Sequence, residues 1–352
     1  MASIAVIPGD GIGAEVTAEA VRLLELLRGE GLPLSWRTFD YSAERYLATG
    51  VALPPGGREE LASFDAIFLG ALGDPRVPDM VHAREILLET RFRLDLYVNV
   101  RPVRLLHASH TPLKDRTERD IDFVIFRENT EGPYVGAGGF LKPGTPDEVA
   151  IQEWVATRKG VERILRHAFE AARRRPRRRL VMVDKHNALR FASEIWHRLF
   201  REVAKEYPDV EARHLFADTA CLLLVQDPSQ FDVIVTDNLF GDLLSDLGAA
   251  LVGGLGLAPS ASLNPQTGKG LFEPVHGSAP GIAGTGRANP MAALLTAAMM
   301  LEFLRQGEAA ARVERAVRDC IAENLVTPDL GGSLTTRAVG QAVLDRLSKG
   351  AA

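Results

Sequence analysis

Two kinds of hydrophobic pattern alternate along the chain. Short apolar runs rich in β-branched residues predict buried strands, and longer segments with apolar residues at helical spacing predict amphipathic helices. The predicted strands are 3–7, 64–70, 97–103, 123–127, 180–183, 211–216 and 233–235. The predicted helices are one with Val16, Ala20, Leu23, Leu24 and Leu27 on one stripe, then 84–94, 191–207, one from Asn238, and 290–304. This alternation predicts an α/β protein.

The segment Asp232–Asp246 combines a predicted strand, a turn with a helix-capping pair, and the start of a helix. Asp242 and Asp246 are four residues apart, so that helix places both carboxylates on one face. Their repulsion is relieved if a cation lies between them, and oxygen ligands suit Mg²⁺ or Mn²⁺. An isolated pair of this kind is more often a solvated helix face. Asp218 follows the strand 211–216 and is a candidate third ligand.

Basic residues also follow predicted strands. Lys185 comes directly after the strand 180–183 and is a candidate general base, with a surface salt bridge as the simpler alternative. Arg101 and Arg127 end β-type runs, and Arg91 lies in the helix before them. Guanidinium groups bind carboxylates bidentately, so the three together would suit a di- or tricarboxylate. For any one of these arginines an internal salt bridge explains the sequence equally well.

Four segments rich in glycine and other small residues interrupt the pattern. Gly9–Gly13 has the spacing Gly-x-Gly-x-Gly, which is not a dinucleotide fingerprint and suits a structural turn equally well. The small-residue loop 273–284 would let backbone approach a flat ligand. Segment 132–147 predicts an irregular arm or hairpin, and 249–256 predicts a crossing between domains.

Composition narrows the class of protein. A chain of 352 residues with 46% apolar content can form two domains, and a net charge of −5 gives no reason to expect nucleic acid as a partner. The basic run Arg173–Arg179 is expected to be a solvated helix end. Cys221 and Cys320 are too few and too far apart for a cysteine-based zinc site. With neither an export signal nor a membrane-spanning run, the sequence predicts a cytoplasmic globular protein.

Several motifs in one order and spacing carry a resemblance to a known family. They are Gly9–Gly13, Asn238–Asp246, His276–Pro280 and Ala288–Pro290. Together they resemble the β-decarboxylating dehydrogenases, which act on isopropylmalate, isocitrate, homoisocitrate and tartrate or malate. Within this family, the segments 70–75, 127–134 and 184–187 are most similar to the bacterial isopropylmalate dehydrogenases.

The resemblance implies a two-domain fold that is not the Rossmann fold, with a central mixed sheet flanked by helices and a dimerisation arm. It implies a cofactor-binding domain built from both chain ends, 1–98 and 253–352. The middle, 99–252, would form the substrate, metal and dimerisation domain. It further implies a homodimer in which each active site borrows residues from the partner subunit.

The resemblance also implies roles for single residues. Lys185 would be the base and Tyr134 the acid, while Asp218, Asp242 and Asp246 would bind Mg²⁺ or Mn²⁺, with Lys185 and Asp218 supplied by the other subunit. The substrate would contact Arg91, Arg101, Arg127, Leu87, Leu88 and Asp218. The cofactor NAD would contact Gly73, Asn187, Glu273, His276, Gly277, Ser278, Ala279, Pro280, Gly281, Ile282 and Asn289.

Two departures from the family pattern bear on specificity. Gly281 replaces the aspartate that accepts hydrogen bonds from the adenosine ribose in NAD-using relatives, although Ile282 fits the NAD type and the NADP-type lysine–tyrosine pair is absent. NAD is therefore expected, with weaker binding or a relaxed choice between NAD and NADP left open. Leu87 and Leu88 suit an isopropyl group, but Arg84-Glu85-Ile86 differs from the usual sequence before them.

The expected reaction is oxidative decarboxylation of 3-isopropylmalate to 2-oxoisocaproate in leucine biosynthesis. Tartrate or D-malate dehydrogenase is the main alternative and homoisocitrate dehydrogenase comes next, because an apolar pocket separates such substrates by only a few kcal/mol. An alternative of another class is a catalytically silent regulatory homologue. Such a chain would be expected to lose Lys185, Tyr134 or a metal aspartate, and all are present.

Overall fold

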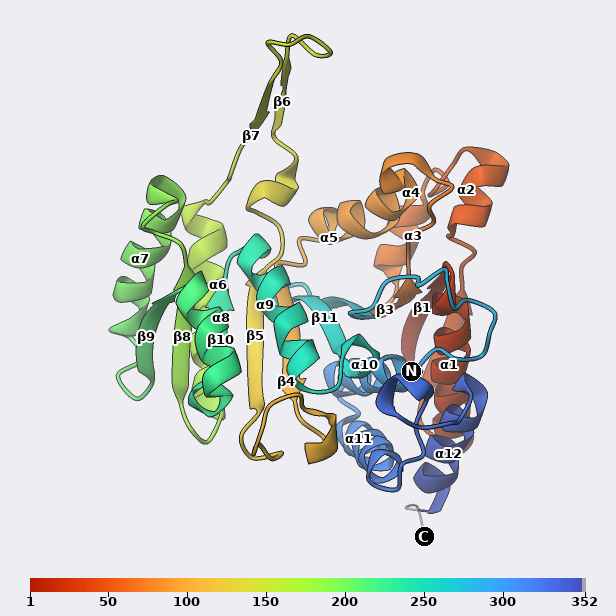
Figure 1. The fold of residues 1–352 in the computed structure, drawn as a ribbon. Coiled ribbons are helices and arrows are strands. Elements are labelled where there is room, and N and C mark those ends of the chain that lie inside the picture. Colours follow the sequence, from red (N-terminus) through yellow and green to blue (C-terminus); the bar gives the residue numbers. More distant parts are fainter. Residues whose placement is uncertain (350–352) are drawn as a thin grey trace. The chain divides into compact units, whose positions relative to one another are not determined.

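The computed structural model describes residues 1–349, which form two compact units (Figure 1). Unit 1 comprises Met1–Leu96, Arg104–Arg119 and the chain from Ala249 onward. Unit 2 comprises Tyr97–Val103 and Asp120–Gly248. Both chain ends therefore contribute to unit 1, and so does a short segment from the middle of the sequence. The division of cofactor, substrate and dimerisation roles between the domains 1–98 plus 253–352 and 99–252 stays a prediction.

Unit 1 contains five strands in the order β2-β1-β3-β12-β11. They are β1 (Ala2–Gly9), β2 (Leu34–Thr38), β3 (Ala66–Ala71), β11 (Pro259–Asn264) and β12 (Lys269–Pro274). β1 is parallel to β2 and β3, and β12 is parallel to β3, whereas β11 and β12 are antiparallel. The arrangement is mixed, as expected. The hydrophobic pattern does not predict strand β11, because alternate buried residues of this strand are polar. They are Ser260, Ser262 and Asn264.

Helices surround the strands of unit 1. They are α1 (Ile12–Gly29), α2 (Ala43–Thr49), α3 (Gly57–Ser63), α4 (Val81–Ala83), α5 (Glu89–Arg93), α10 (Met291–Phe303), α11 (Gly307–Ala322) and α12 (Thr336–Lys349). Helix α10 packs against β3, β11 and β12 and is buried on nearly all sides, in agreement with its apolar, small-residue sequence. Within the described residues, no helix has both the length and the apolar composition needed to cross a membrane.

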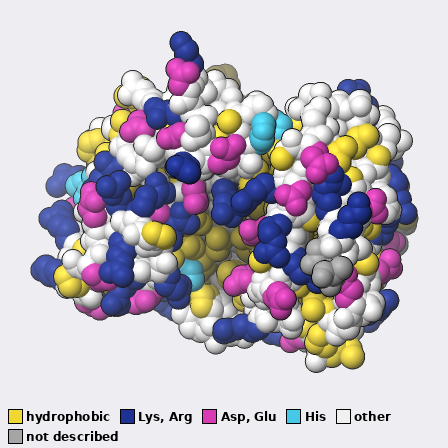
Figure 2. All heavy atoms as spheres, turned by 90° about the horizontal axis from the view of Figure 1, so that it is seen from below, with side chains coloured by type: hydrophobic (Ala, Val, Ile, Leu, Met, Phe, Trp, Pro, Cys, Tyr) yellow, Lys and Arg dark blue, Asp and Glu magenta, His cyan; other side chains and the backbone are white. Residues whose placement is uncertain are grey.

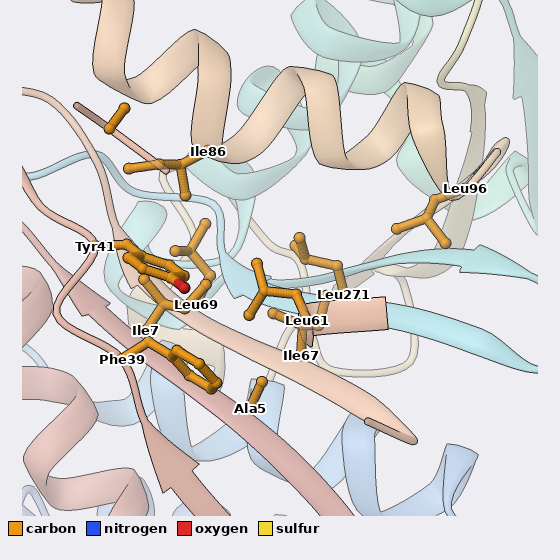
Figure 3. Packing of buried hydrophobic residues seen from close by; sticks show 11 residues of the cluster. Ala5, Ile7, Phe39, Tyr41, Leu61, Ile67, Leu69, Ile86, Leu96 and Leu271 are labelled. Carbon is orange, nitrogen blue, oxygen red and sulfur yellow. The ribbon is translucent and has the colours of Figure 1, made fainter. Parts of the chain in front are cut away.

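A hydrophobic cluster fixes the helix over 81–93 to the strands of unit 1. Figure 3 shows Ile86 of that helix together with side chains from β1 and β3, among them Ile7 and Leu69. Between α4 and α5 the helix contains the π-helical turn η2 (Arg84–Leu88). The predicted helix 84–94 is thus confirmed, with an earlier start and an irregular first half. The 3₁₀ turns are η1 (Pro78–Met80), η3 (Ala108–His110), η4 (Pro133–Val135), η5 (Pro228–Gln230), η6 (Leu255–Leu257) and η7 (Pro328–Leu330).

Unit 2 contains five further strands in the order β4-β5-β10-β8-β9. They are β4 (Val98–Arg104), β5 (Asp122–Glu128), β8 (Arg179–Asp184), β9 (Glu211–Phe216) and β10 (Val233–Thr236). The strands β5, β10, β8 and β9 are parallel to one another. Their helices are α6 (Arg158–Arg174), α7 (Arg190–Ala204), α8 (Ala217–Gln226) and α9 (Asn238–Leu251), of which α6 packs against β5, β8 and β10. The predicted α/β fold with helices flanking a mixed sheet is confirmed.

The predicted hairpin is also present in unit 2. It consists of the antiparallel strands β6 (Gly138–Leu141) and β7 (Val149–Gln152), and it projects from the body of the unit (Figure 1). All eight strand residues are exposed, including Phe140, Leu141, Val149 and Ile151. The second strand begins at Val149, which lengthens the predicted arm.

The basic run Arg173–Arg179 lies at the end of α6 and the start of β8, as expected for a helix end. Its arginines form ion pairs inside unit 2. Arg175 pairs with the buried Asp232 and with Asp122, and Arg179 with Glu211 at 3.1 Å. More generally, basic and acidic side chains are interspersed on the face shown in Figure 2. The run therefore has a local structural role, namely to neutralise buried and edge carboxylates.

Candidate active site

The carboxyl end of β10 and the start of α9 form the centre of the site in unit 2. Asp237 caps the helix, since its Oδ1 accepts a hydrogen bond from the backbone N–H of Phe240 at 3.0 Å. Burial raises the pKa of Asp237 to about 7, against the two backbone N–H groups that favour its charged form. The capping predicted from the sequence is confirmed for Asp237. Its neighbour Asn238 instead uses its side chain to hold an arginine.

That arginine is Arg127, which ends β5 and is almost fully buried. Its Nε and Nη2 donate to Asn238 Oδ1 at 2.9 and 2.7 Å, and its Nη1 forms an ion pair with Asp242 Oδ1. The Tyr134 hydroxyl donates to the other oxygen of Asp242, Oδ2, at 2.9 Å. A side chain at Gly241 would place its Cβ 2.6 Å from the Arg127 Cβ, so this close approach requires glycine. Three predicted site residues thus meet in one hydrogen-bonded group.

The two aspartates of α9 differ in their electrostatics. Burial opposes ionisation of Asp242, but the charge of Arg127, the Tyr134 hydroxyl and the charge of Arg101 outweigh it, so the pKa of Asp242 lies below its usual value. For Asp246, burial and then repulsion from Asp242 raise the pKa. The same two causes, in the same order, raise the pKa of Tyr134. The charges of Arg101 and Arg127 lower the pKa of Asp246 but do not outweigh these two effects. Asp246 remains in contact with solvent, and a cation bound there would favour its ionised form.

A second group of predicted residues lies at the ends of β8 and β9. Lys185 follows β8, and its Nζ is 2.7 Å from Oδ1 of Asp218 in the first turn of α8. The side chain of Asp218 is 67% exposed, and that of Lys185 is 27% exposed. Hydrogen bonding to Lys185 lowers the pKa of Asp218. Asn187, in the turn after Lys185, is also exposed.

Arg101 lies on β4 of unit 2 and is buried, with its Nε donating to Asn99 Oδ1 at 2.8 Å. Arg91 belongs to α5 of unit 1, where it forms a buried ion pair with Glu273 at the end of β12. The Arg91 Nε is buried and has no hydrogen-bond partner within residues 1–349. Leu87 and Leu88 lie in the π-helical turn before it, both partly exposed, and Leu87 also packs against the hydrophobic cluster of Figure 3.

The glycine-rich loops of unit 1 meet around Asp10. Its Oδ2 accepts from the Gly73 backbone N–H at 2.8 Å and lies 2.8 Å from Nε2 of the buried His82. Gly9 and Gly11, both at positive φ, approach the carbonyls of Ala71 and Ser278 so closely that a Cβ would collide with them. The loop Gly9–Gly13 therefore needs its glycines for backbone-to-backbone packing, which favours the structural-turn interpretation.

A pocket of about 680 Å³ opens beside these loops, and its lining includes Gly11, Gly73 and Pro280. Two of the predicted cofactor residues, Gly73 and Pro280, therefore line one cavity. Asn289 is different, because its Nδ2 donates to Asp329 Oδ2 and its Oδ1 accepts from Met291 N, both at 3.0 Å. Its side chain orders the start of α10.

The remaining predicted cofactor residues follow β12. His276 hydrogen-bonds the Gly277 carbonyl through Nδ1 at 3.0 Å, and burial lowers its pKa. Ser278 is buried, Ile282 is partly buried, and Gly277, Ala279, Pro280 and Gly281 are exposed. A Cβ at Gly281 would have nothing within 4 Å.

Sequence patterns missed three partners in these sites. They are Asp10 with His82, Asn238 with Arg127, and Glu273 with Arg91. Each pair joins residues that are distant in sequence, so no local spacing of residues predicts the contact. A buried charged or amide side chain in a motif is the only available signal, because such a group requires a partner.

Comparison with known proteins gives the family. The model of the isocitrate/isopropylmalate dehydrogenase family matches residues 3–343. This chain belongs to that family. It is an oxidoreductase whose relatives include the 3-isopropylmalate dehydrogenase of Thermobifida fusca, 48% identical over 98% of both chains. Another is the 3-isopropylmalate dehydrogenase of Streptomyces coelicolor, 47% identical over 96% of this chain and 99% of the relative.

Solved structures of the family agree with the fold. The isocitrate dehydrogenase from Methylococcus capsulatus is 39% identical, covers 99% of both chains and has a TM-score of 0.89. The predicted membership of the β-decarboxylating dehydrogenases, with bacterial isopropylmalate dehydrogenases as the most similar type, is confirmed by these relatives.

Proposed function

We propose that the protein catalyses NAD-dependent and divalent-metal-dependent oxidative decarboxylation of 3-isopropylmalate to 2-oxoisocaproate, a step of leucine biosynthesis in the cytoplasm. The relatives named 3-isopropylmalate dehydrogenase match nearly the whole chain at 47–48% identity. The observation that carries the proposal is the group formed by Arg127, Tyr134 and Asp242. It combines a carboxylate-binding cation, a proton donor and a metal-type ligand in direct contact.

The metal would be held by Asp242 and Asp246, with Asp218 as the third ligand. Their donors are all carboxylate oxygens, which suit Mg²⁺ or Mn²⁺ rather than softer ions. The fit is supported by Asp246, which is exposed and has a pKa raised by burial and by its neighbour Asp242. A cation bound there would offset both effects.

The chemistry requires one proton acceptor and one proton donor. A bound divalent cation would polarise the substrate hydroxyl and adjacent carboxylate, and NAD⁺ would accept the hydride. Lys185 receives the hydroxyl proton as the carbonyl forms. Arg91, Arg101 and Arg127 hold the malate carboxylates. After CO₂ leaves, Tyr134 donates a proton to the carbon that carried it, which agrees with the raised pKa that keeps its hydroxyl protonated.

In this proposal, the choice of substrate depends on the helix over 81–93 of unit 1. Leu87 and Leu88 are partly exposed and apolar, which suits contact with the isopropyl group. The π-helical turn at Arg84–Leu88 coincides with the segment where the sequence departs from the family pattern. Single π-helical turns inside helices are frequent at functional sites. That observation keeps D-malate or tartrate as the second candidate substrate, with the same residues performing the chemistry.

A homodimer with shared active sites is supported by the exposed apolar surface of unit 2. The arm exposes Phe140, Leu141, Val149 and Ile151, and α8 and α9 expose Leu222, Val225 and Leu243. Lys185 and Asp218, the two residues assigned to the neighbouring site, are themselves accessible. Covering these side chains with a second copy would remove apolar surface from water.

Steady-state kinetics with a panel of substrates tests the proposal. We expect kcat/KM for 3-isopropylmalate with NAD⁺ and Mn²⁺ to exceed that for D-malate, tartrate, homoisocitrate and isocitrate by about a hundredfold or more, the discrimination that a few kcal/mol supports. NADP⁺ should be the poorer oxidant. D-malate or tartrate leading would reassign the substrate, and no metal-dependent turnover of any member would overturn the proposed reaction.

A further inference from the structure

Three elements of unit 2 bring a carboxylate and two imidazoles together beside the residue that precedes Lys185. Asp184 is the last residue of β8, His197 lies on α7, and His214 lies on β9. Strands β8 and β9 are parallel, with Met182 opposite His214. The Asp184 side chain is buried, and the two imidazoles are partly buried, with the His214 side chain 25% exposed.

The contacts among the three side chains are incomplete. His214 Nε2 lies 2.8 Å from Asp184 Oδ1 and forms a hydrogen bond with it. His197 Nε2 lies 2.9 Å from the other oxygen, Asp184 Oδ2, but the pair does not have hydrogen-bond geometry. Within residues 1–349 both of these buried atoms are without a hydrogen-bond partner.

The geometry suits a shared ion better than a direct contact. One ligand atom from each of the three residues can be chosen so that all lie within 4.8 Å of one another. Zinc binds imidazole nitrogen and carboxylate oxygen at about 2.0–2.2 Å, so two such ligands lie roughly 3.0–3.5 Å apart. An ion bound by one atom from each residue would draw ligand atoms that now lie within 4.8 Å of one another to that spacing. It would also satisfy the two unpartnered atoms.

The donor set defines the class of ion. Two imidazole nitrogens and one carboxylate suit Zn²⁺, Co²⁺, Ni²⁺ or Cu²⁺, whereas Mg²⁺ and Mn²⁺ prefer oxygen ligands. The aspartates of α9 offer oxygen only. The histidine rings are also in close mutual contact, with centroids of His197 and His214 4.2 Å apart and those of His186 and His197 4.4 Å apart. Burial lowers the pKa of His197, which favours its neutral form, the form that binds metals.

We propose that Asp184, His197 and His214 form a binding site for a divalent transition metal, Zn²⁺ being the representative ion, separate from the Mg²⁺ or Mn²⁺ site of α9. The ion joins the carboxyl end of β8 to α7 and β9. Because Lys185 directly follows Asp184, the site also fixes the backbone that carries this lysine. The proposal does not depend on the identity of the substrate.

Isothermal titration of the full-length protein with Zn²⁺, in the presence of saturating Mg²⁺, tests the site. We expect one Zn²⁺ per chain that Mg²⁺ does not displace. His197→Gln and His214→Gln should each weaken this binding by at least about tenfold. Asp246→Asn should leave it unchanged, and so should the control His167→Gln, which removes a histidine of the same unit on α6.

Co²⁺ provides an independent readout. Imidazole-containing four-coordinate sites give strong visible absorption with Co²⁺, whereas six-coordinate oxygen sites absorb weakly. The absorption should appear in the parent protein and in Asp246→Asn and disappear in His197→Gln. If His197→Gln proves unfolded by circular dichroism without metal, His214→Gln, at the more exposed position, replaces it. Unchanged Zn²⁺ binding in the folded histidine variants, or its loss in Asp246→Asn alone, would overturn the proposal.

Discussion

Arg127 is held by partners on two sides, which sets the direction of its guanidinium group. Asn238 accepts from two of its nitrogens, and Asp242 pairs with the third. A buried cation is tolerated only when it is paired and hydrogen-bonded, and here the pairing also lowers the pKa of the aspartate. The same contacts thus favour the ionised form of Asp242, which its proposed role as a metal ligand requires.

Lys185→Ala tests the proposed base. The substitution removes an accessible ion pair with Asp218, which contributes little to stability, so the fold should persist. Turnover should fall by roughly 10²–10⁴-fold, the usual contribution of a positioned acid or base. Steady-state kinetics and thermal melting measure the two effects, with the exposed Lys159→Ala as control. Near-normal kcat in the folded variant would show that another group takes the proton.

Gly281→Asp tests the account of cofactor choice. Gly281 is exposed and has open space where a Cβ would lie, so the side chain fits without displacing a neighbour. A carboxylate there should accept hydrogen bonds from the adenosine ribose, and a charged hydrogen bond contributes about 1.5–3 kcal/mol. KM for NAD⁺ should fall about tenfold or more with kcat unchanged, while NADP⁺ is disfavoured. An unchanged KM for NAD⁺ would place the ribose elsewhere.

His167 gives a prediction for acid stability. Burial, reinforced by the nearby charge of Arg174, lowers the pKa of His167 from 6.5 to about 4. Between these two values the unfolded chain binds more protons than the folded one, so this group's contribution to stability falls as the pH drops from 6.5 to 4. The free energy of unfolding should decrease by up to about 3 kcal/mol more in the parent protein than in His167→Gln.

Urea titrations at several pH values measure this difference. The variant lowers the absolute stability at every pH, so the comparison uses the slope with pH and not the midpoint itself. Parallel slopes for the parent protein and His167→Gln would show that His167 does not titrate in this range.

At the residue scale, spacing and residue type were enough to single out Asp242 and Arg127, and the family resemblance added Tyr134. The structure brings these three residues into contact. Spacing did not show that Asn238 orients Arg127, or that Asp184 faces two histidines from other elements. Those contacts depend on which strands become neighbours, and strand order is not encoded in any local pattern.

At the element scale, the arm formed by β6 and β7 has little packing of its own to stabilise it. A two-stranded ribbon in water is marginally stable by itself, and every strand residue of this one is exposed. Its apolar residues therefore require a partner surface. This supports the interpretation of the arm as a dimerisation element.

Phe140→Asp tests that interpretation. Phe140 is 67% exposed in the single chain, so the substitution should not destabilise the monomer's core. In a dimer it would bury an unpaired charge, at a cost of several kcal/mol. Sedimentation should show dissociation, with activity per chain lost at low protein concentration. Thr145→Asp, at the exposed and polar tip of the arm, is the matched control. A fully dimeric and active Phe140→Asp would remove the arm from the interface.

Elements with strong periodicity were predictable, and elements with polar interiors were not. The strands β5, β8 and β10 follow the predicted apolar runs closely. Strand β11 was missed because buried serines interrupt its apolar pattern. The π-helical turn at Arg84–Leu88 was also missed, since one extra residue per turn depends on packing around Ile86 and not on helix propensity.

At the scale of the whole molecule, motif order identified the family, and the family implied the fold. Hydrophobic pattern alone would have predicted only alternating strands and helices. The segment Arg104–Arg119 could not be assigned from the sequence. It lies between two parts of unit 2 in the sequence but belongs to unit 1. Neither the composition of this segment nor a linker-like stretch beside it indicates that it belongs to unit 1.

The most direct test of the central claim is the stoichiometry of the reaction with 3-isopropylmalate, NAD⁺ and Mg²⁺. NADH, CO₂ and 2-oxoisocaproate are quantified together from one reaction, with and without a chelator. The account predicts equal amounts of all three products and no reaction once the metal is removed. NADH formed without CO₂, or turnover that survives chelation, would contradict a metal-dependent oxidative decarboxylation.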